Sequence, residues 1–194
     1  MPKPTVKLIL ASRSPRRREL LLAAGYDFEV QPPAETAECG IPSSETPAEL
    51  VARLAYQKAA DVASRAREGL ILGCDTVVEC DGQILGKPTD EHHARQMLQT
   101  LSGRFHRVLT GLCLWKVPDG HPQTRVAITT LCMDPLTAEQ LRDYLRSGQW
   151  IGKAGAFGYQ DRLGWVHVIE GSDSNVVGLP LELLAEMLGP EQSH

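Results

Sequence analysis

The sequence lacks both a cysteine pairing pattern and a long hydrophobic run. Its five cysteines are odd in number and widely spaced, and none lies in a Cys-x-x-Cys pattern. This scatter argues against a zinc ribbon and a disulfide framework, and it favours a reducing, cytoplasmic location. No apolar run approaches the roughly 20 residues of a membrane-spanning helix, so we expect no membrane partner. The apolar segment at 6–11 is too short for a signal peptide, and arginines follow it.

An excess of basic residues is also absent. Lys and Arg total 20 against 24 Asp and Glu, which gives a formal net charge of −4. Binding to a nucleic acid polymer normally needs a basic face, so we expect no such partner. A small anionic ligand would instead need a local basic cluster. The length of 194 residues suits a single domain, 1–194, with a sizeable core.

Apolar runs alternate with capped segments of helical periodicity, which predicts an α/β fold. An Asp81-Gly82 dipeptide between two apolar runs predicts a hairpin turn. We expect strands over 6–11, 27–30, 70–80, 83–85, 104–116, 125–133 and 165–170. We expect helices over 15–24, 47–68, 90–101, 137–147 and 180–188.

A basic cluster follows the first predicted strand, in the stretch LILASRSPRRRELLLAAG. Ser14 and Pro15 predict the N-cap and first residue of a helix. A helix N-terminus exposes backbone N–H groups that bind anions. The Ser12 hydroxyl and the Arg16 and Arg17 guanidinium groups would complete a phosphate-binding corner, because arginine matches phosphate oxygens in pairs. A solvated helix face is the alternative interpretation.

Asp75 lies in the middle of the apolar run LILGCDTVVEC. A charged carboxylate there is costly unless it is paired. It is either a structural group bonded to backbone or lysine, or a carboxylate at a cleft that binds a divalent metal or positions a water. Lys58, on the apolar side of a predicted helix, and Lys87, in a loop, are its candidate partners. Regular alternation turns Thr76 to the other face of the strand.

Three further features carry candidate chemistry. His106, in LSGRFHRVLTG, has no identifiable nucleophile to serve, which favours a structural role. The segment GKAGAFGYQ holds three glycines that allow close backbone approach, and it ends in Gln160, whose amide can recognise a base edge. Glu35 and Glu38, in the loop after the second predicted strand, are candidates for a second metal carboxylate.

Seven segments, in order and spacing, resemble the Maf family of septum-formation-inhibitor-like nucleotide pyrophosphatases. They are LASRSPRRRELL, RLAYQKA, LGCDTVV, GKPTD, LSGRFHRVLTG, KAGAFGYQ and VVGLPL. The resemblance covers nearly the whole chain. It implies a nucleoside triphosphate diphosphatase that releases the monophosphate and pyrophosphate with Mg²⁺ or Mn²⁺. It also implies an elongated α/β fold like that of inosine triphosphatase, with a mixed twisted sheet flanked by helices and two lobes around a central cleft.

The resemblance implies a role for each matching residue. Asp75 falls on the catalytic proton acceptor for the attacking water and on a metal ligand. The implied phosphate ligands are Ser12, Arg17, Lys58 and Lys87. The implied base-selecting positions are Arg16, Thr76 and Gln160, and they match the branch that acts on dTTP and UTP. The branch that prefers 7-methyl-GTP has an aromatic residue at the position of Arg16.

One segment, PPAETAECG, departs from the acidic run of the family. An ungapped alignment places Ala37 at the expected glutamate, and a one-residue shift places Glu38 there. We assign the metal site to Asp75 and Glu38, with Glu35 as the alternative. A non-catalytic nucleotide-sensing regulator of cell division is the alternative function, and it would tolerate loss of Asp75. The choice between canonical and modified pyrimidine triphosphates stays open, and the family resemblance allows a homodimer.

Overall fold

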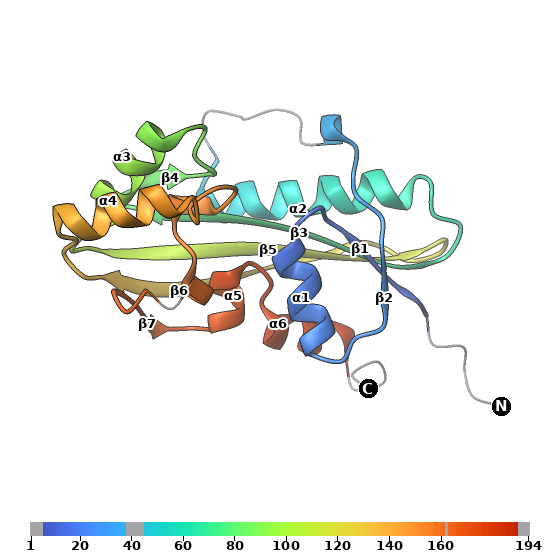
Figure 1. Cartoon of the computed structure of the whole chain (residues 1–194). Coiled ribbons are helices and arrows are strands. Elements are labelled where there is room, and N and C mark those ends of the chain that lie inside the picture. Colours follow the sequence, from blue (N-terminus) through green and yellow to red (C-terminus); the bar gives the residue numbers. More distant parts are fainter. Residues whose placement is uncertain (1–5, 38–44, 162, 190–194) are drawn as a thin grey trace. The chain divides into compact units, whose positions relative to one another are not determined.

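The structure, a computed structural model, describes residues 6–37, 45–161 and 163–189. Strands and helices alternate along these residues, which confirms the predicted α/β class (Figure 1). The strands are β1 (Leu8–Ala11), β2 (Phe28–Val30), β3 (Gly69–Cys80), β4 (Gln83–Leu85), β5 (Phe105–Val117), β6 (Gln123–Met133) and β7 (Val166–Glu170). The α-helices are α1 (Pro15–Ala23), α2 (Pro47–Ala63), α3 (Glu91–Leu101), α4 (Ala138–Ser147), α5 (Asp173–Val177) and α6 (Leu181–Leu188). The short 3₁₀ helices are η1 (Glu35–Ala37), η2 (Ala154–Ala156) and η3 (Tyr159–Asp161).

The described strands form a mixed sheet, as predicted. Its strand order is β2-β1-β3-β5-β6-β7, and β4 pairs with β3. β1 runs parallel to both β2 and β3, whereas the β3–β4 and β6–β7 pairs are antiparallel. The predicted hairpin is confirmed, because Cys80 lies opposite Gln83 and the turn residues Asp81 and Gly82 both have positive φ.

The chain divides into two compact units. The first comprises Met1–Asp75, Thr110–Ala127 and Gly178–His194, and the second comprises Thr76–Leu109 and Ile128–Val177. Strands β3, β5 and β6 contribute residues to both units. Each unit has a hydrophobic core of its own.

The first unit buries both faces of β1 and of its part of β3. Leu10 and Leu72 face a cluster that includes residues of α1 and α6. Their neighbours Ile9 and Ile71 face a second cluster, which includes residues of α2. Figure 1 shows α1 and α2 on opposite faces of β1 and β3. Helices on both faces explain why these strands appear in the sequence as continuous apolar runs rather than as alternating ones.

A glycine in β3 lets α2 come unusually close. A Cβ added to Gly73 would lie 2.9 Å from the Cβ of Ala59 and would collide with the carbonyl oxygen of Ala55. Lys58 precedes Ala59 in the helix, and Asp75 lies two residues beyond Gly73 on the same face of the strand. The missing side chain at Gly73 therefore brings Lys58 within reach of Asp75.

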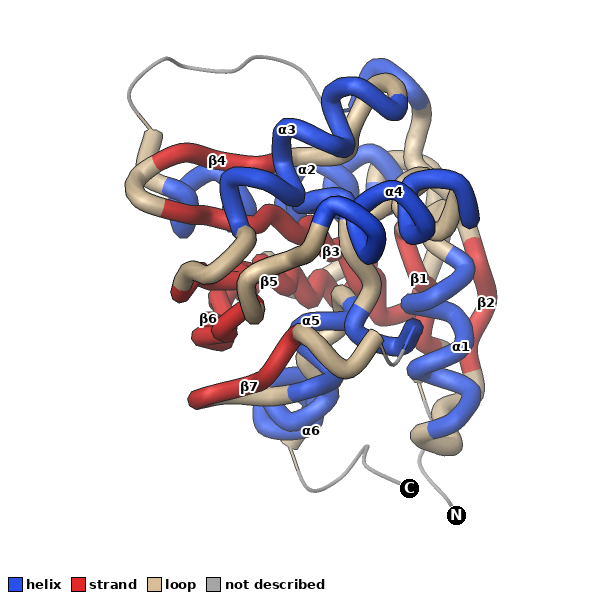
Figure 2. Tube along the Cα trace, turned by 60° about the vertical axis from the view of Figure 1, so that its left-hand side comes forward, coloured by secondary structure: helices blue, strands red, loops and turns tan. Residues whose placement is uncertain are grey.

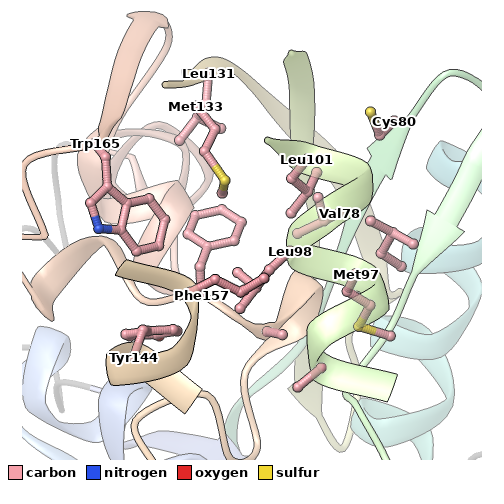
Figure 3. Packing of buried hydrophobic residues seen from close by; sticks show 14 of the residues in the cluster. Val78, Cys80, Met97, Leu98, Leu101, Leu131, Met133, Tyr144, Phe157 and Trp165 are labelled. Carbon is pink, nitrogen blue, oxygen red and sulfur yellow. The ribbon is translucent and has the colours of Figure 1, made fainter. Parts of the chain in front are cut away.

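The second unit packs α3 and α4 over its core, side by side (Figures 1 and 2). Figure 3 shows the ring of Phe157 among buried side chains that include Leu98 and Met133. Tyr144 of α4 packs edge-on against Trp165, with ring centroids 5.5 Å apart. This core fixes the segment that leads to η3.

Two features of the fold differ from the sequence prediction. Helix α2 ends at Ala63, before the expected boundary at 68, and turn hydrogen bonds to the carbonyl of Val62 close its end. Val62 is the last fully buried apolar residue of the helix, so further helical turns would gain little burial. The short helix α5 was not predicted, because five residues are too few to show a periodic pattern.

Candidate active site

The corner between β1 and α1 has the local structure that its sequence predicts. Ser14 is the N-cap of α1, where its hydroxyl accepts from the Arg17 backbone N–H at 3.5 Å, and Pro15 follows it. The buried Ser12 hydroxyl accepts from the Ser14 N–H at 3.2 Å. Arg16, on the first turn of α1, is half-buried. The first turn of α1 contains no acidic residue, so no carboxylate of that turn competes with an anionic ligand for its N–H groups and positive charges.

Arg17 is buried, and its side chain hydrogen-bonds to three parts of the first unit. Its Nε donates to the Gly178 carbonyl at 2.8 Å. Its Nη1 donates to the Cys74 carbonyl at 2.8 Å and to the Ser12 hydroxyl at 3.2 Å. Because the guanidinium group is planar, these bonds fix its orientation. The sequence predicted a phosphate ligand at this position, and the structure adds a role in holding α1, β3 and the Gly178 segment together.

Asp75 pairs with Lys58 in the first unit. The Lys58 Nζ donates to Asp75 Oδ1 at 2.5 Å, and the two side chains are only 8% and 13% exposed. Lys58, one of the two candidate lysines, is thus a partner of Asp75. A buried pair of this kind holds the carboxylate in one orientation.

Arg53 is a neighbouring charge that sequence reasoning missed. Its Nε and Nη2 bind the Glu45 carboxylate at 2.6 and 2.7 Å. The hydrogen bond to Glu45 raises the pKa of Arg53 above its usual value, and the negative charge of Asp75 adds to this rise. Arg53 therefore lies within the electrostatic field of Asp75. The sequence did not indicate a role for Arg53, because this residue does not interrupt the apolar pattern of the helix as Lys58 does.

The Cys74 thiol next to Asp75 offers no nucleophile. It lies in the core, within 3.3 Å of the Gly178 carbonyl oxygen, and burial raises its pKa above the usual value. A thiol with a raised pKa is a poor source of thiolate.

The second unit holds the other predicted site residues. Thr76 follows Asp75 in β3 and is half-buried, whereas Lys87 and Gln160 are exposed. The loop of Lys87 is tied to the glycine-rich segment, because the Gly155 N–H donates to the Gly86 carbonyl at 3.0 Å. Within this unit, the structure thus links the segments that carry Lys87 and Gln160.

His106, also in the second unit, has the structural role that its sequence favoured. Its ring is buried and meets Phe157 edge-on at a centroid distance of 5.4 Å. Burial lowers its pKa below the usual value. The neutral ring therefore packs as part of the core.

The predicted metal carboxylates have unequal support. Glu35 is exposed and lies 3.8 Å from the Arg13 guanidinium, whereas Glu38 lies outside the described residues. Within 6–37, 45–161 and 163–189, no group of three or more His, Cys, Asp or Glu side chains is placed to hold a metal ion. Mg²⁺ commonly binds through one or two carboxylates together with substrate phosphates. Asp75 fits that mode, and the described residues do not form an all-protein metal cage.

None of the helices in the described part of the chain has the length and apolar character needed to cross a membrane.

Comparisons with known proteins agree with the sequence resemblance. The family model of Maf-like proteins matches residues 7–191. A dTTP/UTP pyrophosphatase of Rhodopirellula baltica is 58% identical over 93% of this chain and 80% of its own length. A dTTP/UTP pyrophosphatase of Carboxydothermus hydrogenoformans is 44% identical over 92% of this chain and 95% of its own length.

Among solved structures, a nucleoside-triphosphatase (dITP/XTP pyrophosphatase) of Mycobacterium abscessus is 14% identical. The match covers 68% of this chain and 76% of that one, with a TM-score of 0.41. A likeness of this size carries no argument about the site.

Proposed function

Because this chain belongs to the family of Maf-like proteins, we propose that it hydrolyses dTTP and UTP to their monophosphates and pyrophosphate. It is a nucleoside triphosphate pyrophosphatase, a hydrolase that acts on a phosphoric anhydride bond. The observation that carries this function is the 58% identity to a dTTP/UTP pyrophosphatase over 93% of the chain. The scattered cysteines favour the cytoplasm as its compartment.

Asp75 is the proposed proton acceptor. The oxygen of a water attacks the α-phosphorus, the bond from that phosphorus to the bridging oxygen of the β-phosphate breaks, and pyrophosphate leaves. The proton of the water passes to the Asp75 carboxylate. Lys58 supports this role because its ammonium group holds one carboxylate oxygen in place. A base that is already oriented costs nothing to arrange during the reaction.

Ser12, Arg17, Lys58 and Lys87 are the proposed phosphate ligands. Phosphoryl transfer depends mainly on positioning and on neutralising charge, so cations around the leaving pyrophosphate supply the larger part of catalysis. The hydrogen bonds of Arg17 to Gly178, Cys74 and Ser12 support this assignment, because they fix its guanidinium group before substrate arrives. The N-terminus of α1 adds backbone N–H donors, whose partial positive charge also attracts phosphate.

Asp75 is also the proposed protein ligand for Mg²⁺ or Mn²⁺, together with Glu38 or, alternatively, Glu35. A bound divalent ion would polarise the phosphoryl oxygens and offset the charge that develops on them. The largely buried Asp75 carboxylate, with no all-protein metal cage among the described residues, supports a site that is completed by the phosphates of the substrate.

Gln160, with Arg16 and Thr76, is proposed to recognise the base. A glutamine amide offers both an acceptor and donors, which matches the N3–H donor and O4 acceptor of uracil and thymine. The exposure of Gln160 supports a role in contacting a ligand rather than in the core.

The test is pyrophosphate release with Mg²⁺ or Mn²⁺ from dTTP, UTP, CTP, GTP, 7-methyl-GTP and ITP. We expect rapid release from dTTP and UTP, loss of release on removal of the metal with EDTA, and loss in the Asp75→Asn variant. Inorganic phosphate and the nucleoside diphosphate as products would refute attack at the α-phosphorus. Nucleotide binding without hydrolysis of any member of the panel would favour the alternative, a non-catalytic nucleotide sensor. Sedimentation of the same sample tests for a homodimer.

A further inference from the structure

Gln160 is the middle residue of η3, a single turn in the second unit. Its neighbour Asp161 bonds to the side chains of Lys153 and Tyr144, and η3 packs against α5, whereas Gln160 is exposed. An exposed residue in a turn that is anchored in this way has a fixed backbone and an accessible side chain. This is the arrangement expected of a residue that contacts a ligand with a defined orientation.

The anchor after Gln160 is an ion pair. Asp161 Oδ2 pairs with the Lys153 Nζ, and both side chains are only 10% exposed. The same oxygen accepts from the Tyr144 hydroxyl at 3.2 Å. The ring of Tyr144 packs edge-on against Trp165 in the core (Figure 3), and this packing holds its hydroxyl next to Asp161.

Gly158 leaves just enough space for this ion pair. A Cβ added there would lie 2.5 Å from Asp161 Oδ2 and would collide with the Lys153 Nζ. The Gly158 carbonyl also accepts from the Asp161 N–H at 3.1 Å. The turn that carries Gln160 is therefore closed by a backbone bond and packed against the charged pair.

On the other side of Gln160, η3 packs against α5. Burial, together with the nearby Asp173 at the start of that helix, raises the pKa of Tyr159. Helix α5 is itself fixed by the buried Asn175, whose Nδ2 donates to the Val108 carbonyl at 3.1 Å and to the Thr129 hydroxyl at 2.9 Å. The turn η3 is thus held by the ion pair of Asp161 and by its packing against α5.

We infer that Asp161, held by Lys153 and Tyr144, is a positioning residue that fixes Gln160 for discrimination between uracil and cytosine. The inference rests on the proposed function. Uracil presents an N3–H donor and an O4 acceptor, whereas cytosine presents an N3 acceptor and an N4 donor. A glutamine amide carries both an acceptor and donors, so a shift of its backbone along the base edge changes which of them meets the base. A backbone that does not move therefore favours the contacts with one of the two bases.

A purely stabilising role explains the pair less well. Two buried charges are costly to desolvate, and replacing such a pair with apolar side chains is often neutral or favourable for stability. What the pair adds is a defined position for the residue beside it. It follows that loss of the pair should alter base selectivity more than it alters turnover.

The experiment compares kcat and KM for UTP and CTP in the wild type and in Asp161→Asn. We expect the UTP-to-CTP ratio of kcat/KM to fall about tenfold, mainly through the KM for UTP, with kcat for UTP within about twofold of wild type. The double variant Lys153→Met/Asp161→Asn leaves no unpaired buried lysine, and we expect the same loss of selectivity. Gln160→Ala serves as the reference for complete loss of the base contact.

Arg107→Gln is the matched control. It removes an ion pair of the same unit, Arg107 Nε to Glu79 Oε2 at 2.7 Å, between β5 and β3. We expect its UTP-to-CTP ratio to equal that of the wild type. Thermal unfolding of every variant reports whether the fold is retained.

The outcomes separate the two proposals. Wild-type protein that releases pyrophosphate from no nucleotide overturns the proposed function and this inference with it. An active wild type combined with an unchanged ratio in Asp161→Asn and in the double variant overturns the inference alone. Equal losses on UTP and CTP would reveal a structural role only and also overturn it, as would an unchanged ratio in Gln160→Ala.

Discussion

Replacing Asp75 with asparagine should affect stability and activity by different physical routes. The substitution keeps the size of the side chain and removes its charge. The ammonium of Lys58, only 8% exposed, then loses its ionic partner. Lys58→Met removes the opposite charge, and the double variant Lys58→Met/Asp75→Asn removes both.

The magnitude follows from the burial of the pair. Removing one partner of a buried ion pair costs about 3–5 kcal/mol, because the remaining charge is desolvated and uncompensated. The amide oxygen introduced by Asp75→Asn can still accept one hydrogen bond, so we expect a loss of about 3 kcal/mol for this variant. The double variant should recover about 2 kcal/mol of this loss, since no buried charge remains. Activity should fall about 10²- to 10⁴-fold with the loss of the general base, and the double variant should not recover it.

Urea unfolding at neutral pH measures the unfolding free energy of the wild type, the two single variants and the double variant. Pyrophosphate release from UTP measures their activity. The matched control is Glu186→Gln, which breaks an exposed ion pair of the first unit, Arg125 Nη1 to Glu186 Oε2 at 3.0 Å. We expect that control to change the unfolding free energy by less than about 1 kcal/mol and to leave activity unchanged.

Two outcomes would refute this reasoning. Near-wild-type turnover in Asp75→Asn would show that this carboxylate does not accept the proton. Additive stability losses in the double variant would show that the two side chains do not interact energetically in solution.

Two further predictions concern packing and pH. Gly73→Ala should destabilise the chain by about 1–3 kcal/mol in urea unfolding and lower activity, because its Cβ would collide with the Ala55 carbonyl and displace α2. Gly86→Ala has no atom within 4 Å of the new Cβ and should shift stability by less than about 0.5 kcal/mol; equal effects would contradict the close approach of α2. Burial lowers the pKa of His106 from its ordinary 6.5. Above about pH 6.5 the neutral ring contributes its full share of the unfolding free energy. This share is lost as the pH falls from 6.5 toward the folded-state pKa, because the unfolded chain binds the proton more tightly. Thermal unfolding between about pH 7.5 and 5.5 should show a smaller decline in His106→Phe than in the wild type, and an identical decline would contradict this.

The sequence by itself determined the local structure around the site. Ser14, Asp90 and Thr137 occupy the N-caps that their residue types predict. The Asp81-Gly82 turn and the apolar runs of the central strands lie where the pattern placed them. These features depend on neighbours along the chain or on burial of a whole segment, and both are visible in a short window of sequence. The order of the seven matching segments also identified the family.

Only the tertiary structure decided which charged groups meet. The sequence names Lys58 and Lys87 as candidate partners of Asp75, and the close approach of α2 at Gly73 is what brings Lys58 to it. The bond from Arg17 to the Gly178 carbonyl spans 161 positions of sequence, so no local pattern signals it.

The ion pair beside Gln160 was invisible for the same reason. In the sequence, Asp161 has no feature that distinguishes it from other loop residues. In the structure it pairs with Lys153 beside Tyr144, in space that the missing side chain of Gly158 leaves open. A residue type tells which partner a charge needs, whereas the distance between two side chains is set by the path of the backbone between them. The residue types therefore determined which chemistry was available, and the fold decided where it was brought together.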